Sequence, residues 1–177
     1  MDATRVRKTG RCGSLRAFQE ELSRRIAAAG TVVRKDVRLA VKTGSSGWLI
    51  RLPDAGELVP LPELTPVPLT QPWFRGLANV RGTLYAVVDL CVFIGDTPNA
   101  GKARPRLMLV GRRFGNNSAL LVERMIGLRN LADFSEIERT RSEQWAGSQY
   151  RDADGQHWCE LEIETLLQAP EFVRVGI

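Results

Sequence analysis

The chain has very little of the two residue types that build metal centres and disulfide frameworks. It contains one histidine, His157, and three cysteines, Cys12, Cys91 and Cys159, none of which belongs to a CxxC pair. A structural zinc site takes four ligands, mostly of these two types, so a Cys/His zinc site is out of reach. Three cysteines cannot all pair with one another. We therefore expect no metal and no cofactor.

Long apolar runs are also missing. The first residues, MDATRVRKTGRCGSLRAF, carry charges without an apolar core, so no secretory signal peptide is expected. No apolar run approaches the length that a membrane-spanning helix needs. Lone cysteines without a signal peptide favour the reducing cytosol. We predict a cytoplasmic protein without direct membrane insertion.

Sequence motifs of catalysis are absent as well. No GxSxG elbow, HExxH helix or GxxxxGK(S/T) loop occurs. His157 stands in a segment typical of a strand surface. Neither Cys91 nor Cys159 has a helix N-terminus or a basic cluster nearby in sequence to lower its pKa. The alternating glutamates at 160–164 are typical of a solvated face. We expect no catalytic residue and predict that the protein is not an enzyme.

The excess of positive charge is confined to one end of the chain. Residues 1–16 contain five basic residues and one acidic residue, so they carry +4 of the net charge of +5. The remaining body is nearly neutral and has no general attraction for nucleic acid. Small barrels bind RNA or DNA through basic residues interleaved with stacking aromatics. Only 112–114 shows such a pattern, in a predicted turn. A small β-barrel nucleic-acid-binding protein is the alternative, and we expect no nucleic-acid partner.

The N-terminal part divides into two predicted segments. Residues 1–13 are polar and basic without a periodic pattern, which predicts a disordered tail. Residues 14–30 predict a helix, because Ser14 suits the N-cap, apolar residues recur every three or four positions and Gly30 ends the pattern. Such a stripe is typical of a helix docked on its own domain, with partner binding as the alternative. Residues 31–177 then form the main domain.

From residue 36 onward the period changes to alternation. Residues 36–42 alternate apolar and charged side chains, and 48–52 predict the returning strand of a hairpin. Six of the nine prolines lie between Pro53 and Pro72, which forbids a long helix or a central strand there. Short strand pieces, such as 57–61, and a rigid extended loop both remain possible.

Strand patterns also dominate the second half. Residues 83–95 are nearly all β-branched, aromatic or aliphatic, as in a strand buried on both faces. The composition of 95–105 predicts a loop, the best place for a boundary between two lobes. Further strands are predicted at 106–112, 118–124 and 125–131. A hairpin at 149–158 and a short C-terminal helix stopped by Pro170 follow. Without long helices between strands, small barrels fit better than a parallel βαβ sheet.

One stretch carries a more specific pattern. Residues 64–95 combine a proline-containing approach, the segment aromatic-x-G-x-x-N-x-R-G and a strand ending in V-D-L. The positions are Pro66, Phe74, Gly76, Asn79, Arg81, Gly82, Val88, Asp89 and Leu90. This combination resembles the CheW family, the adaptors of bacterial chemosensory arrays, and weaker similarity covers roughly residues 36–168. The helix before the first strand, the P-L-P-x-L-x-P-V-P approach at 60–68 and the Y-R-D-x-D-G-x-x-W segment are similar to the PilI branch, which serves type IV pilus (twitching) systems.

The resemblance implies a mainly β fold of two small SH3-like five-stranded β-barrel lobes packed side by side. An N-terminal helix and a short C-terminal helix accompany the lobes. The implied function is a non-catalytic adaptor that joins the cytoplasmic tip of a methyl-accepting chemoreceptor to the regulatory domain of a CheA-like histidine kinase. In such adaptors the receptor tip lies in an apolar groove between the lobes and barrel ends contact the kinase. The cytoplasmic protein is then recruited to membrane-associated receptor arrays.

The candidate partner-binding residues follow from the motif. They are Glu57, Gly76, Asn79, Val80, Arg81 and Gly82. Arg81 stands at the edge of the expected buried strand, where neither a turn nor a core needs a guanidinium group. Its five fixed donors can clamp carbonyls or a carboxylate at a lobe edge. The family pattern places an acidic partner on the preceding strand, and Glu57 occupies that place. The alternative is that Arg81 is an incidental surface charge.

Overall fold

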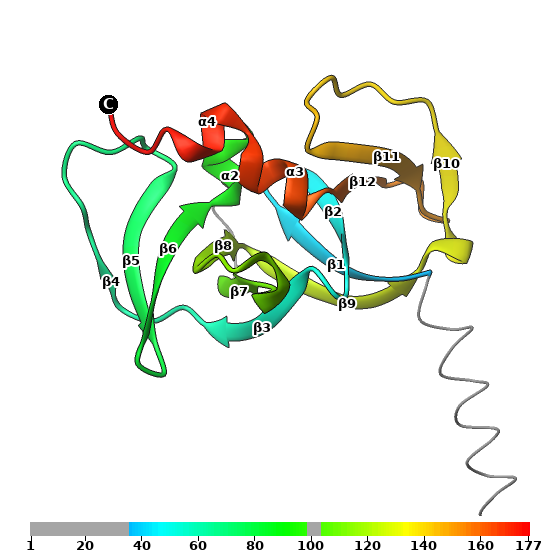
Figure 1. The fold of residues 1–177 in the computed structure, drawn as a ribbon. Helices are drawn as coiled ribbons and strands as arrows, with labels where there is room; N and C mark the ends of the chain where they lie inside the picture. Colours follow the sequence, from blue (N-terminus) through cyan, green and yellow to red (C-terminus); the bar gives the residue numbers. More distant parts are fainter. Residues whose placement is uncertain (1–35, 99–103) are drawn as a thin grey trace, which may run out of the picture. The chain divides into compact units, whose positions relative to one another are not determined.

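The fold is built almost entirely from short strands (Figure 1). The computed structural model describes residues 36–98 and 104–177, which belong to one compact unit, Asp36–Ile177. The predicted disordered tail (1–13) and N-terminal helix (14–30) lie outside the described residues. Within the described ranges the chain forms twelve strands and three short α-helices, arranged around two six-stranded sheets. The prediction of a mainly β fold is confirmed.

The first sheet has the strand order β10-β11-β12-β2-β1-β9. Its strands are β1 (Val37–Thr43), β2 (Ser46–Arg51), β9 (Arg124–Asn130), β10 (Ser135–Ile137), β11 (Ala146–Arg151) and β12 (His157–Leu161). β1 and β2 form the hairpin that the alternating pattern predicts, and β11 and β12 form the predicted second hairpin. β12 runs parallel to β2, so the end of the domain is joined to its beginning.

The second sheet has the order β3-β7-β8-β6-β5-β4. Its strands are β3 (Ala55–Pro60), β4 (Leu64–Thr65), β5 (Phe74–Val80), β6 (Thr83–Asp89), β7 (Arg106–Val110) and β8 (Ser118–Val122). In the proline-rich segment a short strand, β3, forms and pairs with β7. Each sheet has six strands where five were expected in each lobe, because the short strands β4 and β10 extend the two sheets at their edges.

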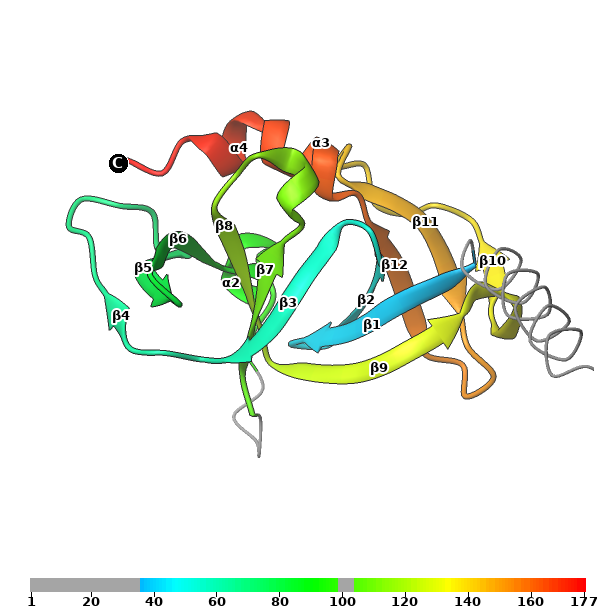
Figure 2. The ribbon, with the colours of Figure 1, turned by 60° about the horizontal axis from the view of Figure 1, so that its bottom comes forward.

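The chain passes between the two sheets twice (Figure 2). It leaves the first sheet after β2, at residues 52–54, and returns to it between β8 and β9, at Glu123. The strands on both sides of 95–105 belong to the second sheet, where β6 and β8 pair in parallel. The predicted lobe boundary near 95–105 therefore does not coincide with a change of sheet.

Three apolar clusters hold the two sheets. The largest contains residues from both of them, including Leu39 and Trp48 of the first sheet and Met108 and Leu120 of the second. A second cluster draws only on the second sheet, and a third only on the first sheet and its connections. Each sheet thus encloses apolar side chains of its own, as two barrel-like lobes do, while the shared cluster joins the lobes into one unit.

The apolar run at 83–95 does not continue as a strand. The strand β6 ends at Asp89, whose carboxylate accepts hydrogen bonds from the backbone N–H groups of Cys91 (3.1 Å) and Val92 (3.4 Å). This N-cap starts the short helix α2 (Leu90–Phe93). The prediction of a strand through residue 95 was wrong for its last six residues, because apolar content alone cannot distinguish a buried strand from a buried helical turn.

The C-terminal segment closes the shared core. It forms α3 (Ile163–Gln168) and α4 (Pro170–Val173), with Pro170 at the start of α4. Figure 1 shows α4 beside α2, and the rings of Phe93 and Phe172 lie 5.4 Å apart, centroid to centroid. Trp73 packs against both rings. Aromatic residues from three distant segments thus fix the upper side of the second lobe in Figure 1.

Candidate partner-binding site

The candidate site is the turn that joins β5 and β6. Val80 pairs with Thr83, so the loop between them consists of Arg81 and Gly82 alone. Both have positive φ angles, +52° and +83°, which is the geometry of a type I′ turn. The side chain of Asn79 supports the turn, because its Oδ1 accepts a hydrogen bond from the backbone N–H of Gly82 at 2.8 Å. Figure 1 shows this turn projecting at the lower left, away from α3 and α4.

The sequence pattern suggested that Arg81 stands at the edge of a buried strand. The structure does not place it there. Its side chain is 76% exposed at the tip of a hairpin. Asparagine and glycine are the residues that such a position favours, since a left-handed backbone costs other L-residues about 1–2 kcal/mol. A long charged side chain in this conformation is not explained by the stability of the turn. Backbone strain at an exposed position is typical of functional sites.

The guanidinium group of Arg81 is held by Glu57. Nη2 of Arg81 lies 2.5 Å from Oε1 of Glu57, whose side chain is 43% exposed. β3, which carries Glu57, and β5 are separated by three strands in the order of the sheet, so the contact requires the sheet to curl on itself. The pair is largely in solvent and adds only about 0–1 kcal/mol to stability. Its main effect is to orient a charged group at the lobe tip.

The other predicted residues divide into two groups. Gly82 is part of the turn, and Val80 lies beneath it, half-buried against the apolar cluster of the second sheet. Gly76 lies four residues back along β5, about 13 Å from Val80 at the usual strand rise. A Cβ atom there would stand 2.2 Å from the carbonyl oxygen of Thr65, and φ is +113°. Gly76 therefore permits the close approach of β4, and the structure does not bring it to the tip.

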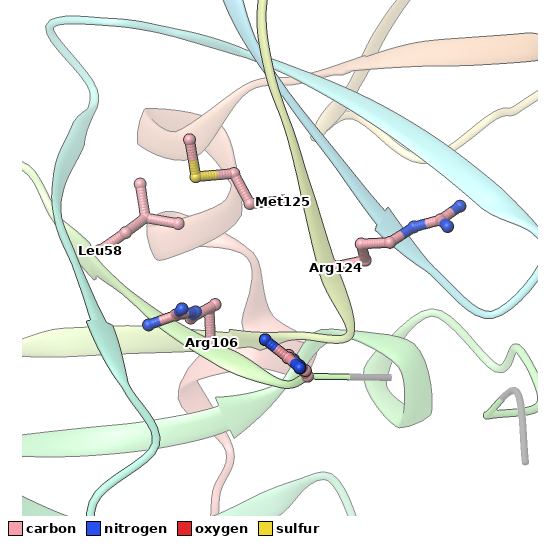
Figure 3. Close-up of a pocket in the computed structure, with 5 residues that line it drawn as sticks. Leu58, Arg106, Arg124 and Met125 are labelled. Carbon is pink, nitrogen blue, oxygen red and sulfur yellow. The ribbon is translucent and has the colours of Figure 1, made fainter. Parts of the chain in front are cut away.

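A second surface lies between the two sheets. A cavity of about 520 Å³ is lined by Leu58, Arg104, Arg106, Arg124 and Met125 (Figure 3). Leu58 and Arg106 come from β3 and β7 of the second sheet, while Arg124 and Met125 come from β9 of the first. The resemblance implied an apolar groove between the lobes. The groove in this chain is different, because three of its five lining residues are arginines.

Comparison with known proteins decides the family. The profile of the CheW-like domain matches residues 39–171, three quarters of the chain. The chain belongs to the CheW family. Protein PilI of Pseudomonas aeruginosa is 27% identical over 115 residues, which cover 63% of this chain and 64% of that protein. The chain thus aligns with just under two thirds of the length of this relative.

A solved structure shows the same fold as this CheW-like domain. It is the scaffolding protein TtCheW from Thermoanaerobacter tengcongensis, with a TM-score of 0.63 over 77% of this chain and 94% of that chain. The sequence identity is 16%, so the likeness concerns the fold. Together with the two six-stranded sheets, it confirms the predicted arrangement of two SH3-like lobes.

One exposed residue at the β5–β6 hairpin tip of this CheW-like domain was not predicted from the sequence. Leu84 lies directly opposite Asn79 in the hairpin and is 58% exposed. The apolar run at 83–95 suggested burial on both faces, but β6 is fully buried only at Val87 and Val88. The signal was the nearness of Leu84 to the turn, since residues beside a two-residue hairpin loop extend beyond the body of the sheet. An exposed apolar side chain on the same hairpin as a guanidinium held by an ion pair suits a protein–protein contact.

The titratable groups described outside the tip include two buried thiols. Burial raises the pKa of the Cys159 thiol to about 11, and burial likewise raises the pKa of Cys91, so both thiols stay protonated at neutral pH. His157 is exposed and contacts Arg151. In the part of the chain that the structure describes, no three His, Cys, Asp or Glu side chains are grouped as a metal site requires. No helix there has the length and hydropathy of a membrane span.

Proposed function

We propose that this CheW-like protein is a non-catalytic adaptor that couples chemoreceptors to a histidine kinase in a chemosensory pathway. Membership of the CheW family supports the adaptor role. The similarity to Protein PilI supports the more specific proposal that the pathway controls type IV pilus twitching motility. The protein acts in the cytoplasm and is recruited to receptor arrays at the membrane.

The observation that carries the proposal is the exposed tip of the β5–β6 hairpin. Arg81 is strained and solvent-exposed, Glu57 holds its guanidinium group, and Leu84 adds an exposed apolar side chain to the same hairpin. Fixing the side chain before binding reduces the entropy that the complex has to overcome. We assign this tip to the regulatory domain of a CheA-like kinase, and the groove between the sheets to the cytoplasmic tip of a methyl-accepting chemoreceptor.

Two separate surfaces suit a protein that bridges two partners. Each contact can be weak, because many copies in an array supply avidity through high effective concentration. Signalling needs more than co-assembly. Receptors in the kinase-activating and kinase-inhibiting states must engage the adaptor with different free energies, since a ligand that binds both states equally shifts neither.

The test is a capture experiment with the kinase regulatory domain immobilised. We expect wild-type protein to bind and Arg81→Glu to lose most of this binding. Arg112→Glu is the matched control, because Arg112 is exposed on the same lobe but lies outside the hairpin tip. A mobility-shift assay with RNA and DNA at several salt concentrations runs in parallel. Steeply salt-dependent nucleic-acid binding that survives removal of residues 1–16, without kinase capture, would favour the nucleic-acid alternative.

A further inference from the structure

The groove between the sheets combines apolar side chains with three arginines that find no acidic partner among the described residues. Among residues 36–98 and 104–177, no carboxylate forms an ion pair with Arg104, Arg106 or Arg124. Other arginines of the second lobe do form ion pairs, since Arg81 and Arg113 each contact a carboxylate within 2.6 Å. Three uncompensated guanidinium groups around one cavity create a local positive potential that attracts an anionic partner.

The arrangement of the side chains favours a long partner over a small anion. Figure 3 shows Leu58 and Met125 on one side of the groove, while the guanidinium groups of Arg106 and Arg124 point in opposite directions. A phosphate-sized anion is bound tightly when donors converge on it, and these two do not converge. Met125 is 46% exposed, which leaves an apolar surface next to the charges. The partner must therefore cover the apolar side chains and also reach guanidinium groups that point apart.

The edges of the groove favour a helix over an added strand. Among the strands of the described residues, β9 pairs only with β1, and β3 only with β7, so each is the edge strand of its sheet there. Both pairings carry a register shift, at Ala40/Val41 opposite β9 and at Ala55/Leu58 within β3. Irregularities of this kind disrupt the row of backbone groups that an incoming strand would need. An amphipathic helix needs no such row, because it binds through side chains laid along a groove.

We propose that this groove selects an acidic amphipathic helix, with apolar residues against Leu58 and Met125 and carboxylates on both flanks facing the arginines. The inference rests on the proposed function, because the helix belongs to the receptor tip assigned to this groove. Nucleic acid is a poorer fit, because none of the described residues that line the cavity is an aromatic one on which a base could stack. Arg106 and Arg124 are then the residues that determine receptor specificity.

The experiment measures binding of two designed peptides by fluorescence anisotropy. Both are helical with the same leucine stripe; one carries glutamates on its flanks and the other lysines at the same positions. We expect full-length wild-type protein to bind the glutamate peptide and not the lysine peptide. The variant Arg106→Glu with Arg124→Glu weakens binding of the glutamate peptide about tenfold or more and gains binding of the lysine peptide. The milder pair Arg106→Gln with Arg124→Gln gives an intermediate loss and serves if the reversal does not fold.

The control variant has the same net charge. Arg112→Glu with Arg174→Glu reverses two exposed arginines outside the groove and is expected to change peptide affinity by less than about twofold. Equal losses in both double variants would mean that only overall charge matters, and the proposal fails. It fails also if the wild type binds both peptides alike, or if single-stranded RNA binds with a dependence on Arg106 and Arg124 and the glutamate peptide does not.

Capture of a receptor-tip fragment separates this proposal from the proposed function. If the groove variant captures the fragment as well as the wild type, the groove proposal is wrong and the adaptor function stands. If the wild type captures neither the receptor fragment nor the kinase domain but binds the glutamate peptide through the arginines, the adaptor function is wrong and the groove still selects an acidic helix.

Discussion

Replacing Arg81 with asparagine separates stability from binding at the hairpin tip. Arg81 has φ +52° in a type I′ turn, where asparagine is favoured, so the substitution relieves strain of about 1 kcal/mol. It also removes an ion pair that is largely in solvent, worth about 0–1 kcal/mol. The two contributions oppose each other. We expect the free energy of unfolding to change by less than about 1 kcal/mol, a shift in Tm of no more than about 4 °C.

Binding should respond very differently. The asparagine lacks the charged, five-donor group, and losing a charge-assisted contact at an interface costs on the order of 2–5 kcal/mol. The Kd for the kinase regulatory domain should therefore rise by roughly 30-fold or more. The assays are thermal unfolding followed by circular dichroism and titration calorimetry with the kinase domain. Glu57→Gln is the companion variant, because it leaves the turn and the guanidinium group in place and removes only the side chain that orients it.

Charge reversal extends the same test. Arg81→Glu places two carboxylates together and should lower the Tm by only a few degrees, because both side chains are exposed. The double variant, Glu57→Arg with Arg81→Glu, should recover some stability but little binding. The surface of the partner stays complementary to the original arrangement of charges. Unfolding of Arg81→Asn or a fall in Tm beyond about 10 °C would show that Arg81 is structural. No change in either stability or binding would make it an incidental charge.

Three further predictions concern neighbouring features of the domain. Gly76→Ala should lower the free energy of unfolding by at least about 2 kcal/mol, measured by urea titration, because its Cβ atom would meet the Thr65 carbonyl at 2.2 Å; wild-type stability would show that β4 can move aside. Leu84→Ser should change the free energy of unfolding by less than about 0.5 kcal/mol yet weaken kinase capture. Val173→Ser, at a similarly exposed position, is the control and should leave capture unchanged. If both variants capture the kinase equally well, Leu84 is not part of the site. Burial alone would raise the pKa of Asp152, but hydrogen bonds from Trp158 and two backbone N–H groups outweigh it and lower this pKa. The ionised carboxylate therefore stabilises the fold above about pH 4, and this stabilisation is lost as the pH falls through the folded-state pKa. The difference in free energy of unfolding between wild type and Asp152→Asn should therefore become smaller in acid, and a larger difference would contradict the prediction.

Local patterns predicted the strands well where alternation or a turn signal was strong. The hairpins β1–β2 and β11–β12 follow from such signals. The end of β6 could not be predicted in the same way. The apolar run continues beyond Asp89 and favours a strand, whereas Asp89 in fact caps a helix there. Strand order was also beyond local reasoning. The parallel pairings β6–β8 and β12–β2 join segments separated by loops or by most of the domain, and nothing in either strand specifies its partner.

The two surfaces show the same contrast. The motif predicted the residues of the hairpin tip, and Glu57 contacts Arg81 as the family pattern implied, although their role in partner binding stays a prediction. The left-handed conformation of Arg81 was not foreseen, because it depends on the pairing of Val80 with Thr83. The resemblance implied a groove between the lobes, but the arginines that line it could not be found from sequence. Arg106 and Arg124 are 18 positions apart on strands of different sheets, and only the fold brings them to one cavity.

The most direct measurement of the adaptor function is kinase autophosphorylation in a reconstituted mixture of receptor cytoplasmic fragment and kinase, with and without this protein. We predict that receptor-dependent control of the kinase appears only when the protein is added, and that Arg81→Glu folds normally but fails to restore it. Arg112→Glu should restore it fully. If the receptor controls the kinase equally well with and without the protein, the protein is not the adaptor that we propose.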